Sequence, residues 1–151
     1  MKQFSLLMLL LLPGYGYACS CADLSLKGTV EGADIIYIGE LKSAELVYPE
    51  SYDGWHQVQG HLQVKDRIKG YAPDIDLIQT GTGGGDCGVM MTIGREYLIF
   101  KRKNDIRIGI CDGSKQIDGH RDTARIERIK HYTYVLKEHR SGRLSLSSGL
   151  M

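Results

Sequence analysis

The feature that most constrains the fold of this chain is its set of four cysteines, two of which stand one residue apart. Cys19 and Cys21 lie directly behind a hydrophobic leader, whereas Cys87 and Cys111 lie far along the chain. An even number of cysteines in an exported chain predicts that all of them form disulfides. A bond between Cys19 and Cys21 would close a strained ring of very few residues, so two long-range pairings remain, one interleaved and one nested. Either pairing would clamp the segment around Cys19 to the body of the protein.

The leader is typical of a secretory signal peptide. Lys2 supplies its positive charge, and an apolar run over residues 4–12 follows, which is too short to span a bilayer. Small residues at Gly16 and Ala18 predict cleavage between Ala18 and Cys19. A lipoprotein signal also ends before a cysteine, but it favours leucine where this chain has Gly16. We therefore expect a secreted or periplasmic protein, with a lipid anchor as the less favoured alternative.

The length that remains suits one domain. Removal of residues 1–18 from 151 leaves 133, from which we expect one domain over residues 19–139 and a flexible tail over residues 140–151. The tail, "RSGRLSLSSGLM", is small and polar and has no periodicity. Lys2 is the only charged residue of the leader, so the mature chain carries 18 basic and 18 acidic side chains. This balance attracts neither nucleic acid nor an anionic membrane.

Most of the chain between residues 33 and 112 carries strand signals, which predict a mainly β fold. Residues 57–69 alternate apolar and polar side chains, as a half-buried strand does. Asn104 and Asp105 are typical of a tight turn between the last two strands. The expected strands cover residues 33–45, 57–69, 74–80, 96–103 and 106–111.

Three further segments complete the expected organisation. "YPESYDGWHQ" predicts a long exposed hairpin loop between the first two strands. "GTGGGDCG" lacks the lysine of a phosphate-binding P-loop, which favours a strand connection held by Cys87. In "DTARIERIKHYTYVLKEH", Ile126, Ile129, Thr133 and Leu136 fall near helical spacing and predict an amphipathic helix against the sheet. No recognisable catalytic or metal-ligand motif is present, so we do not expect an enzyme.

The Cys-Ser-Cys stretch suggests a specific chemistry for the amino terminus. Two residues apart on an extended segment, Cys19 and Cys21 both point into the domain, whereas Ser20 points away from it. An α-amino group has a pKa of about 7.7 to 8, so it can become a metal ligand near neutral pH. With the carbonyl oxygen of the same residue it forms a five-membered chelate, which fits the open position of a catalytic zinc. The simpler alternative is that both cysteines are ordinary structural cross-links.

Short stretches along the chain resemble one known family. They are "CSC", "ADIIYIGE", "RIKG", "CGV", "REYLIF" and "ICDG". In this order and at these intervals they resemble the amino-terminal inhibitory domain of the tissue inhibitors of metalloproteinases, from Cys19 to about Gly113. The resemblance implies a five-stranded OB-fold-like Greek-key barrel of the netrin type with flanking α-helices. It also implies that Cys19 pairs with Cys87, and Cys21 with Cys111.

The resemblance further implies roles for individual residues. The backbone amine and carbonyl of Cys19 would chelate the zinc of the target protease, and the Ser20 side chain would enter the mouth of its specificity pocket. The loop over residues 84–86 matches the second edge of the inhibitory wedge, joined to the first edge by a disulfide. The residues expected to contact the protease are Cys19, Ser20, Cys21, Ala22, Gly85, Asp86 and Cys87.

These observations predict a secreted inhibitor of zinc metalloendopeptidases, whose partner is a zinc metalloproteinase and which has no cofactor of its own. The alternative is an extracellular netrin-like module that binds a protein partner without inhibiting a protease. A third hypothesis, metal capture or thiol redox chemistry by Cys-x-Cys, predicts free thiols. Two departures from the family bear on inhibition. Ala22 and Asp23 stand where its familiar members have a small residue and proline, and Asp86 adds a carboxylate near the protease's own catalytic glutamate.

Overall fold

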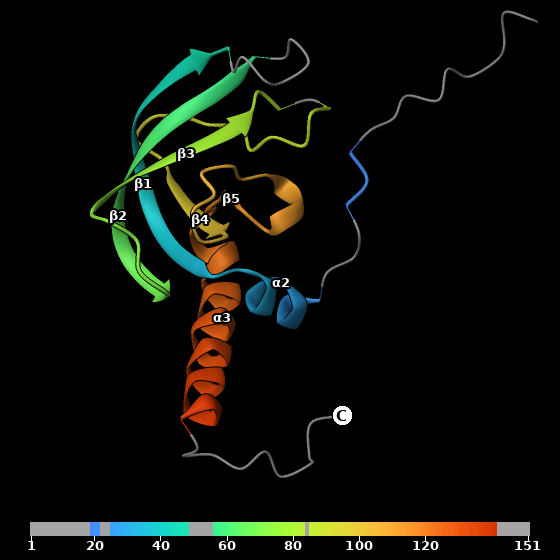
Figure 1. Cartoon of the computed structure of the whole chain (residues 1–151), viewed down its shortest axis with the longest axis vertical. Coiled ribbons are helices and arrows are strands. Elements are labelled where there is room, and N and C mark those ends of the chain that lie inside the picture. The colour runs from blue at the N-terminus through green and yellow to red at the C-terminus, as the bar shows by residue number, and fades with distance from the viewer. Residues whose placement is uncertain (1–18, 22–24, 49–55, 84, 142–151) are drawn as a thin grey trace, which may run out of the picture.

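Five antiparallel strands form one curved sheet, which two α-helices accompany (Figure 1). The computed structural model describes residues 19–21, 25–48, 56–83 and 85–141. The expected leader, and residues 142–151 of the expected tail, lie outside the described residues. The strands, in the order β3-β2-β1-β4-β5 across the sheet, are β1 (Ile35–Val47), β2 (Gln57–Lys69), β3 (Ile75–Gly81), β4 (Glu96–Lys101) and β5 (Lys115–Gln116).

The strand β1 organises the sheet because it pairs with two neighbours. It pairs with β2 as far as Val47, which lies opposite Gln57, so the segment between them connects a long hairpin. On its other edge it pairs with β4 only over residues 35–40. The loop "YPESYDGWHQ" therefore begins and ends at the tip of this hairpin, although its residues 49–55 lie outside the described residues.

The curvature of the sheet brings its β3 edge against the segment that follows β4. The Gln79 amide donates to the Ile106 carbonyl oxygen at 2.7 Å, and the Ile108 amide donates to the Gln79 carbonyl oxygen at 2.8 Å. These bonds form a single parallel bridge between Gln79 and Arg107. The architecture is thus consistent with a small β-barrel-like fold.

The prediction of a strand over residues 106–111 is wrong. After the bridge at Arg107 the chain enters a short 3₁₀ helix, η1 (Ile110–Asp112). The Asp112 carboxylate accepts hydrogen bonds from the Gly109 amide at 2.7 Å and the Ser114 amide at 2.8 Å, and so turns the chain. The fifth strand of the sheet is β5, which pairs with β4.

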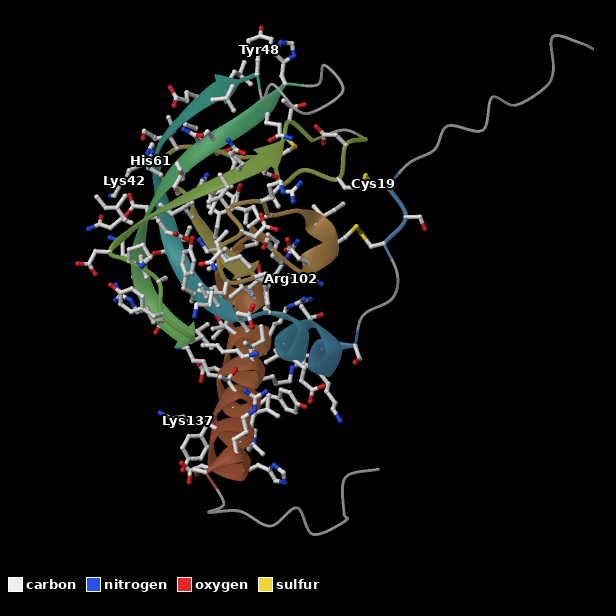
Figure 2. All side chains as sticks on the ribbon, in the orientation of Figure 1. Cys19, Lys42, Tyr48, His61, Arg102 and Lys137 are labelled. Carbon is white, nitrogen blue, oxygen red and sulfur yellow. A yellow bond between two sulfur atoms is a disulfide. The ribbon has the colours of Figure 1, made fainter. Side chains whose placement is uncertain are left out.

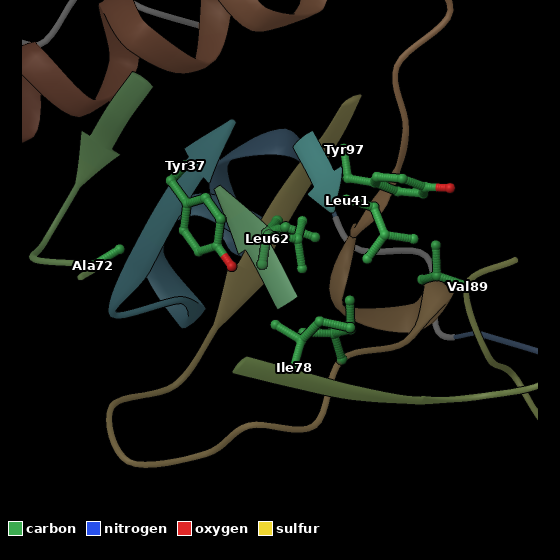
Figure 3. Close-up of a cluster of buried hydrophobic side chains, with 9 residues drawn as sticks. Tyr37, Leu41, Leu62, Ala72, Ile78, Val89 and Tyr97 are labelled. Carbon is green, nitrogen blue, oxygen red and sulfur yellow. The ribbon is translucent and has the colours of Figure 1, made fainter. Parts of the chain in front are cut away.

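The alternation of side chains along β4 supplies two hydrophobic clusters. Tyr97 and Ile99 point into the concave side of the sheet, and Leu98 and Phe100 point to the opposite side, where the helices lie. All four are buried. Figure 3 shows the concave cluster, whose other buried members are Tyr37, Leu41, Leu62, Ala72, Ile78, Val89 and Ile108.

The helices α2 (Leu26–Gly32) and α3 (Gly119–Arg140) cover the second cluster. The helical prediction over residues 122–139 is confirmed, with Ile126 and Ile129 buried. The short α2 was not predicted, because its seven residues include two glycines and show no clear period. Ser25 starts it, since its Oγ accepts from the Gly28 amide at 3.1 Å. None of the helices in the described part of the chain has the length and apolar character needed to cross a membrane.

Candidate functional site

Two disulfides attach the amino-terminal segment to the rest of the domain. Cys19 is bonded to Cys87 and Cys21 to Cys111, with Cα–Cα distances of 5.5 and 5.1 Å. This is the interleaved pairing, which is also the one that the family resemblance implies. Figure 2 shows both bonds on the side of the molecule that carries Cys19. All four cysteines form disulfides, so the structure contains no free thiol for redox chemistry or metal capture.

The segment over residues 19–21 lies against the loop that leads from β3 to Cys87. The Cys19 Sγ atom is 3.2 Å from the carbonyl oxygen of Gly85, and Gly85 itself is exposed. Ser20 is exposed as well, whereas Cys19 and Cys87 are half-buried. We call residues 19–21 and 85–87 together the ridge. Of the other expected wedge residues, Ala22 and Gly84 lie outside the described residues.

The carboxylate of Asp86 organises the loop from within. Its Oδ2 atom accepts from the Thr82 amide at 2.6 Å and from the Thr82 hydroxyl at 3.1 Å. Its Oδ1 atom accepts from the amides of Gly83 at 3.0 Å and Gly88 at 2.9 Å. Both oxygens are therefore engaged inside the loop, which the sequence analysis did not predict.

These hydrogen bonds also determine the charge state of Asp86. Partial burial acts to raise its pKa, but the hydrogen bonds from Gly88, Thr82 and Gly83 act in the opposite direction and together outweigh it. The pKa of Asp86 is therefore lowered from its ordinary value, and the group is ionised at neutral pH. Its negative charge is stabilised by hydrogen-bond donors of its own loop.

The glycines of "GTGGGDCG" have a packing role. A Cβ atom on Gly88 would collide with the backbone of Gly81, and a Cβ atom on Gly81 would collide with the Asp86 carboxylate. Cys87 itself takes the left-handed conformation, with φ of 58°. The glycine run thus lets the chain fold tightly around Asp86, in agreement with the interpretation as a strand connection held by Cys87.

The turn around Cys111 is fastened to the ridge by the backbone. The Ile110 amide donates to the Cys87 carbonyl oxygen at 3.0 Å. Ser114 ties the same turn to β4, because its buried hydroxyl accepts from the Phe100 amide at 2.9 Å. Burial raises the pKa of Asp112, although the hydrogen bonds from Ser114 and Gly109 oppose that effect.

The sequence analysis did not identify two side chains, Tyr97 and Thr80, that hold the chain directly after the ridge by hydrogen bonds to its backbone. The buried Tyr97 hydroxyl accepts from the Thr92 amide at 2.6 Å and so holds the chain that follows the ridge. Thr80 acts in the same way on Val89, whose amide donates to the threonine hydroxyl at 2.8 Å. Both contacts join residues that lie within about ten positions of Cys87 but belong to no recognisable motif. Asp112 and Asp86 each had a local signal, since an aspartate whose carboxylate accepts from the amide two residues further on is typical of an Asx-turn.

A cleft of about 400 Å³ lies behind the ridge, between α2 and the η1 turn. Its lining includes Cys87 and Cys111 together with Arg102, Arg107 and Asp112. Because this lining carries charges of both signs, the cleft favours no single class of ligand.

The comparisons with known proteins assign no family to this chain. No protein-family model matches the sequence, and a search of curated proteins finds no match. The functional proposal therefore depends on the motifs and on the geometry of the ridge.

Proposed function

We propose that the protein is a secreted inhibitor of zinc metalloendopeptidases and not an enzyme. Cys19, freed by cleavage after Ala18, chelates the zinc of the protease through its amino group and its carbonyl oxygen. One observation carries the proposal: two disulfides hold residues 19–21 beside the Cys87 loop with Ser20 exposed. A terminus held for core stability alone would need only one of these bonds.

The chelate acts by replacing the nucleophile of the protease. A catalytic zinc keeps one coordination position for water, and a neutral amine together with the neighbouring carbonyl oxygen can occupy that position. Because Cys19 is bonded to Cys87 before binding, little conformational entropy is lost when the complex forms. Ser20, the next residue, then enters the specificity pocket as a small uncharged side chain.

The inward orientation of Asp86 supports this proposal. An unpaired carboxylate on the ridge would repel the catalytic glutamate of a metalloprotease. In this loop the Asp86 oxygens accept four hydrogen bonds from Thr82, Gly83 and Gly88. Asp86 keeps its negative charge but needs no partner from the protease, because donors of its own loop already stabilise that charge.

We further propose that the barrel is an OB-fold of the netrin type. Strands β1, β2 and β3 form a meander, and β4 returns to lie beside β1, which is the strand order of a Greek key. The parallel bridge between Gln79 and Arg107 closes the curved sheet on its other side. Closure by one bridge fits the partly open barrel of this fold.

The experiment that tests inhibition compares two forms of the oxidised protein. One begins at Cys19, and the other carries a single additional alanine, which turns the amine into an amide. We expect the first form to inhibit at least one member of a panel of zinc metalloproteinases and the second to lose that inhibition. Equal melting temperatures would show that only the terminal nitrogen differs. If both forms are folded and neither inhibits any protease, the proposal is wrong.

A second candidate is an extracellular netrin-like module that binds a protein partner through the β1–β2 hairpin. Leu46 and Tyr48 are exposed near its tip, and the Tyr48 ring packs edge-on against His56 with centroids 4.4 Å apart (Figure 2). Acetylation of the Cys19 amine distinguishes the two functions, since it abolishes zinc chelation and spares a partner that binds the hairpin.

A further inference from the structure

Two large apolar side chains adjoin the ridge and remain exposed. Met90 is 74% exposed and Ile110 is 45% exposed. The Met90 side chain lies over Gly83, where a Cβ atom would come within 2.9 Å of the Met90 Cγ atom. Ile110 is joined to the ridge directly, because its amide donates to the Cys87 carbonyl oxygen. We call Met90 and Ile110 the apolar rim.

The backbone beneath both rim residues is fixed. The Met90 carbonyl oxygen accepts from the buried Tyr97 hydroxyl at 3.2 Å. The Ile110 carbonyl oxygen accepts from the Gly113 amide at 3.2 Å, and the next residue, Cys111, is in a disulfide. The two side chains are therefore presented on a rigid support, which lowers the entropy lost when a partner packs against them.

Five of the six ridge residues beside the rim have side chains without charge, whereas Arg102 and Arg107 line the neighbouring cleft. Cys19, Ser20, Cys21, Gly85 and Cys87 carry no ionisable side chain in the disulfide-bonded protein, and the remaining ridge residue, Asp86, is bonded within its loop. The buried centre of a protein interface is depleted in charged residues and enriched in methionine and aromatic side chains. A single exposed apolar residue is common on any protein, but two on a fixed backbone beside a ridge with one charged side chain, itself hydrogen-bonded within its loop, can form a contact surface.

We propose that the apolar rim determines which proteases this protein inhibits. Met90 and Ile110 pack against apolar side chains that border the cleft of the target, while Cys19 binds its zinc. The target class is then a zinc metalloproteinase whose cleft is bordered by apolar rather than charged residues. The inference rests on the proposed inhibitory function and adds a basis for target choice to it.

The test uses the oxidised protein that begins at Cys19. Met90→Ser and Ile110→Ser are each expected to raise the inhibition constant about tenfold for the protease that the parent inhibits best, mainly through faster dissociation. Met90→Leu conserves volume and should stay within about twofold of the parent. Ile75→Ser is the matched control, because Ile75 is also an exposed apolar residue, with 64% of its surface accessible. It lies at one end of β3, whereas Gly81, at the other end, adjoins the ridge loop.

The outcomes separate this inference from the function on which it rests. If the serine variants keep both disulfides and the parent melting temperature but inhibit as well as Ile75→Ser, the rim does not select the target and the inference is overturned. If the parent inhibits the protease in that experiment, the proposal that Cys19 chelates zinc is not affected by this result. If the parent inhibits no protease, the proposed function fails and the inference fails with it. A salt titration adds a second readout: contacts through an uncharged rim predict an inhibition constant that changes little with ionic strength.

Discussion

A cluster of three polar side chains lies inside the concave side of the sheet, away from the ridge. Lys101 of β4 contacts both carboxylate oxygens of Asp76 of β3, at 2.8 and 2.6 Å, and Tyr37 of β1 donates to Asp76 at 2.7 Å. All three side chains are buried. Burial, the hydrogen bond to Asp76 and the charge of Asp76 raise the pKa of Tyr37, so it stays a neutral donor. The cluster joins three strands through one carboxylate.

Removal of one charge from this cluster should be strongly destabilising. Lys101→Met leaves Asp76 as a buried charge with a single partner, and we expect the free energy of unfolding to fall by about 3–5 kcal/mol. Lys101→Met combined with Asp76→Asn should be more stable than the single variant, because an amide oxygen still accepts from Tyr37 without a buried charge. Urea unfolding at pH 7 measures both. A single variant within 1 kcal/mol of the parent would contradict the structural role of the pair.

Asp86 gives a prediction with a defined pH dependence. Because its pKa is lowered in the folded state, its contribution to stability is complete above the unfolded value of about 3.9 and is lost as the pH falls through the folded value. Asp86→Asn replaces one acceptor oxygen by a donor that faces backbone amides. We expect about 1–3 kcal/mol of destabilisation at pH 7. Denaturation of both proteins across pH 2–7 should show the difference narrowing below about pH 4, and a difference that is constant with pH would contradict this account.

Among the helices, α3 depends on a carboxylate near its start. Asp122 accepts from the Lys115 ammonium group at 2.6 Å and from the Asp118 amide at 2.7 Å, so it links β5 to the first turn of the helix. Burial acts to raise the pKa of Asp122, but the hydrogen bonds from Asp118 and Lys115 outweigh it and lower that pKa. Asp118, which occupies the N-cap position of α3, makes no capping bond with its side chain.

Substitution of Asp122 should therefore affect the helix more than substitution of its neighbour. We expect Asp122→Ala to lower the free energy of unfolding by about 1–3 kcal/mol, as the loss of a buried charged acceptor does. Asp118→Ala should stay within about 0.5 kcal/mol, because its contact with Arg121 is an exposed ion pair. Thermal unfolding followed by circular dichroism measures both variants. Equal effects would show that capping by Asp118, and not the link to β5, determines the start of α3.

The elements differ in how far the sequence predicts them, and the reasons are local. The alternation over residues 57–69 reproduces the bounds of β2, because one face of that strand packs on the core while the other is exposed. The stretch "IRIGIC" alternates just as strictly, yet Asp112 and the bond from Ile110 to Cys87 turn it into η1. An alternating pattern indicates which residues can face a core. It does not show that a nearby carboxylate, here that of Asp112, accepts hydrogen bonds from backbone amides and ends the strand.

For the molecule as a whole, the resemblance brings the two halves of the ridge together through the implied disulfides, but it does not indicate the side chains that hold them. The roles proposed for Cys19 and Ser20 were inferred from the Cys-Ser-Cys pattern and the resemblance. The bonds of Asp86 lie within residues 82–88, the Tyr97 hydroxyl donates to the Met90 carbonyl oxygen, and Met90 lies over Gly83. These contacts are close in sequence, but they use common residue types and depend on the conformation of the loop, so the sequence pattern alone does not specify them.

The double cross-link gives the last prediction, which concerns how stability and inhibition are divided between the two disulfides. The Cys21–Cys111 bond spans 90 residues, and a loop of that size stabilises a fold by about 4 kcal/mol in the chain-entropy model. Cys21→Ser combined with Cys111→Ser keeps the Cys19–Cys87 bond and the hydrophobic clusters, so we expect a folded protein with a lower melting temperature.

Inhibition by this variant is then measured at a temperature where it is fully folded. If the second bond orients the chelating terminus, the inhibition constant should still rise, because Cys19 can turn about its one remaining attachment and binding must order it again. The parent and an exposed-surface variant such as Ile75→Ser serve as controls for folding and for surface changes. An unchanged inhibition constant would mean that Cys19–Cys87 alone presents the amine, and that Cys21–Cys111 is an ordinary structural cross-link of the domain.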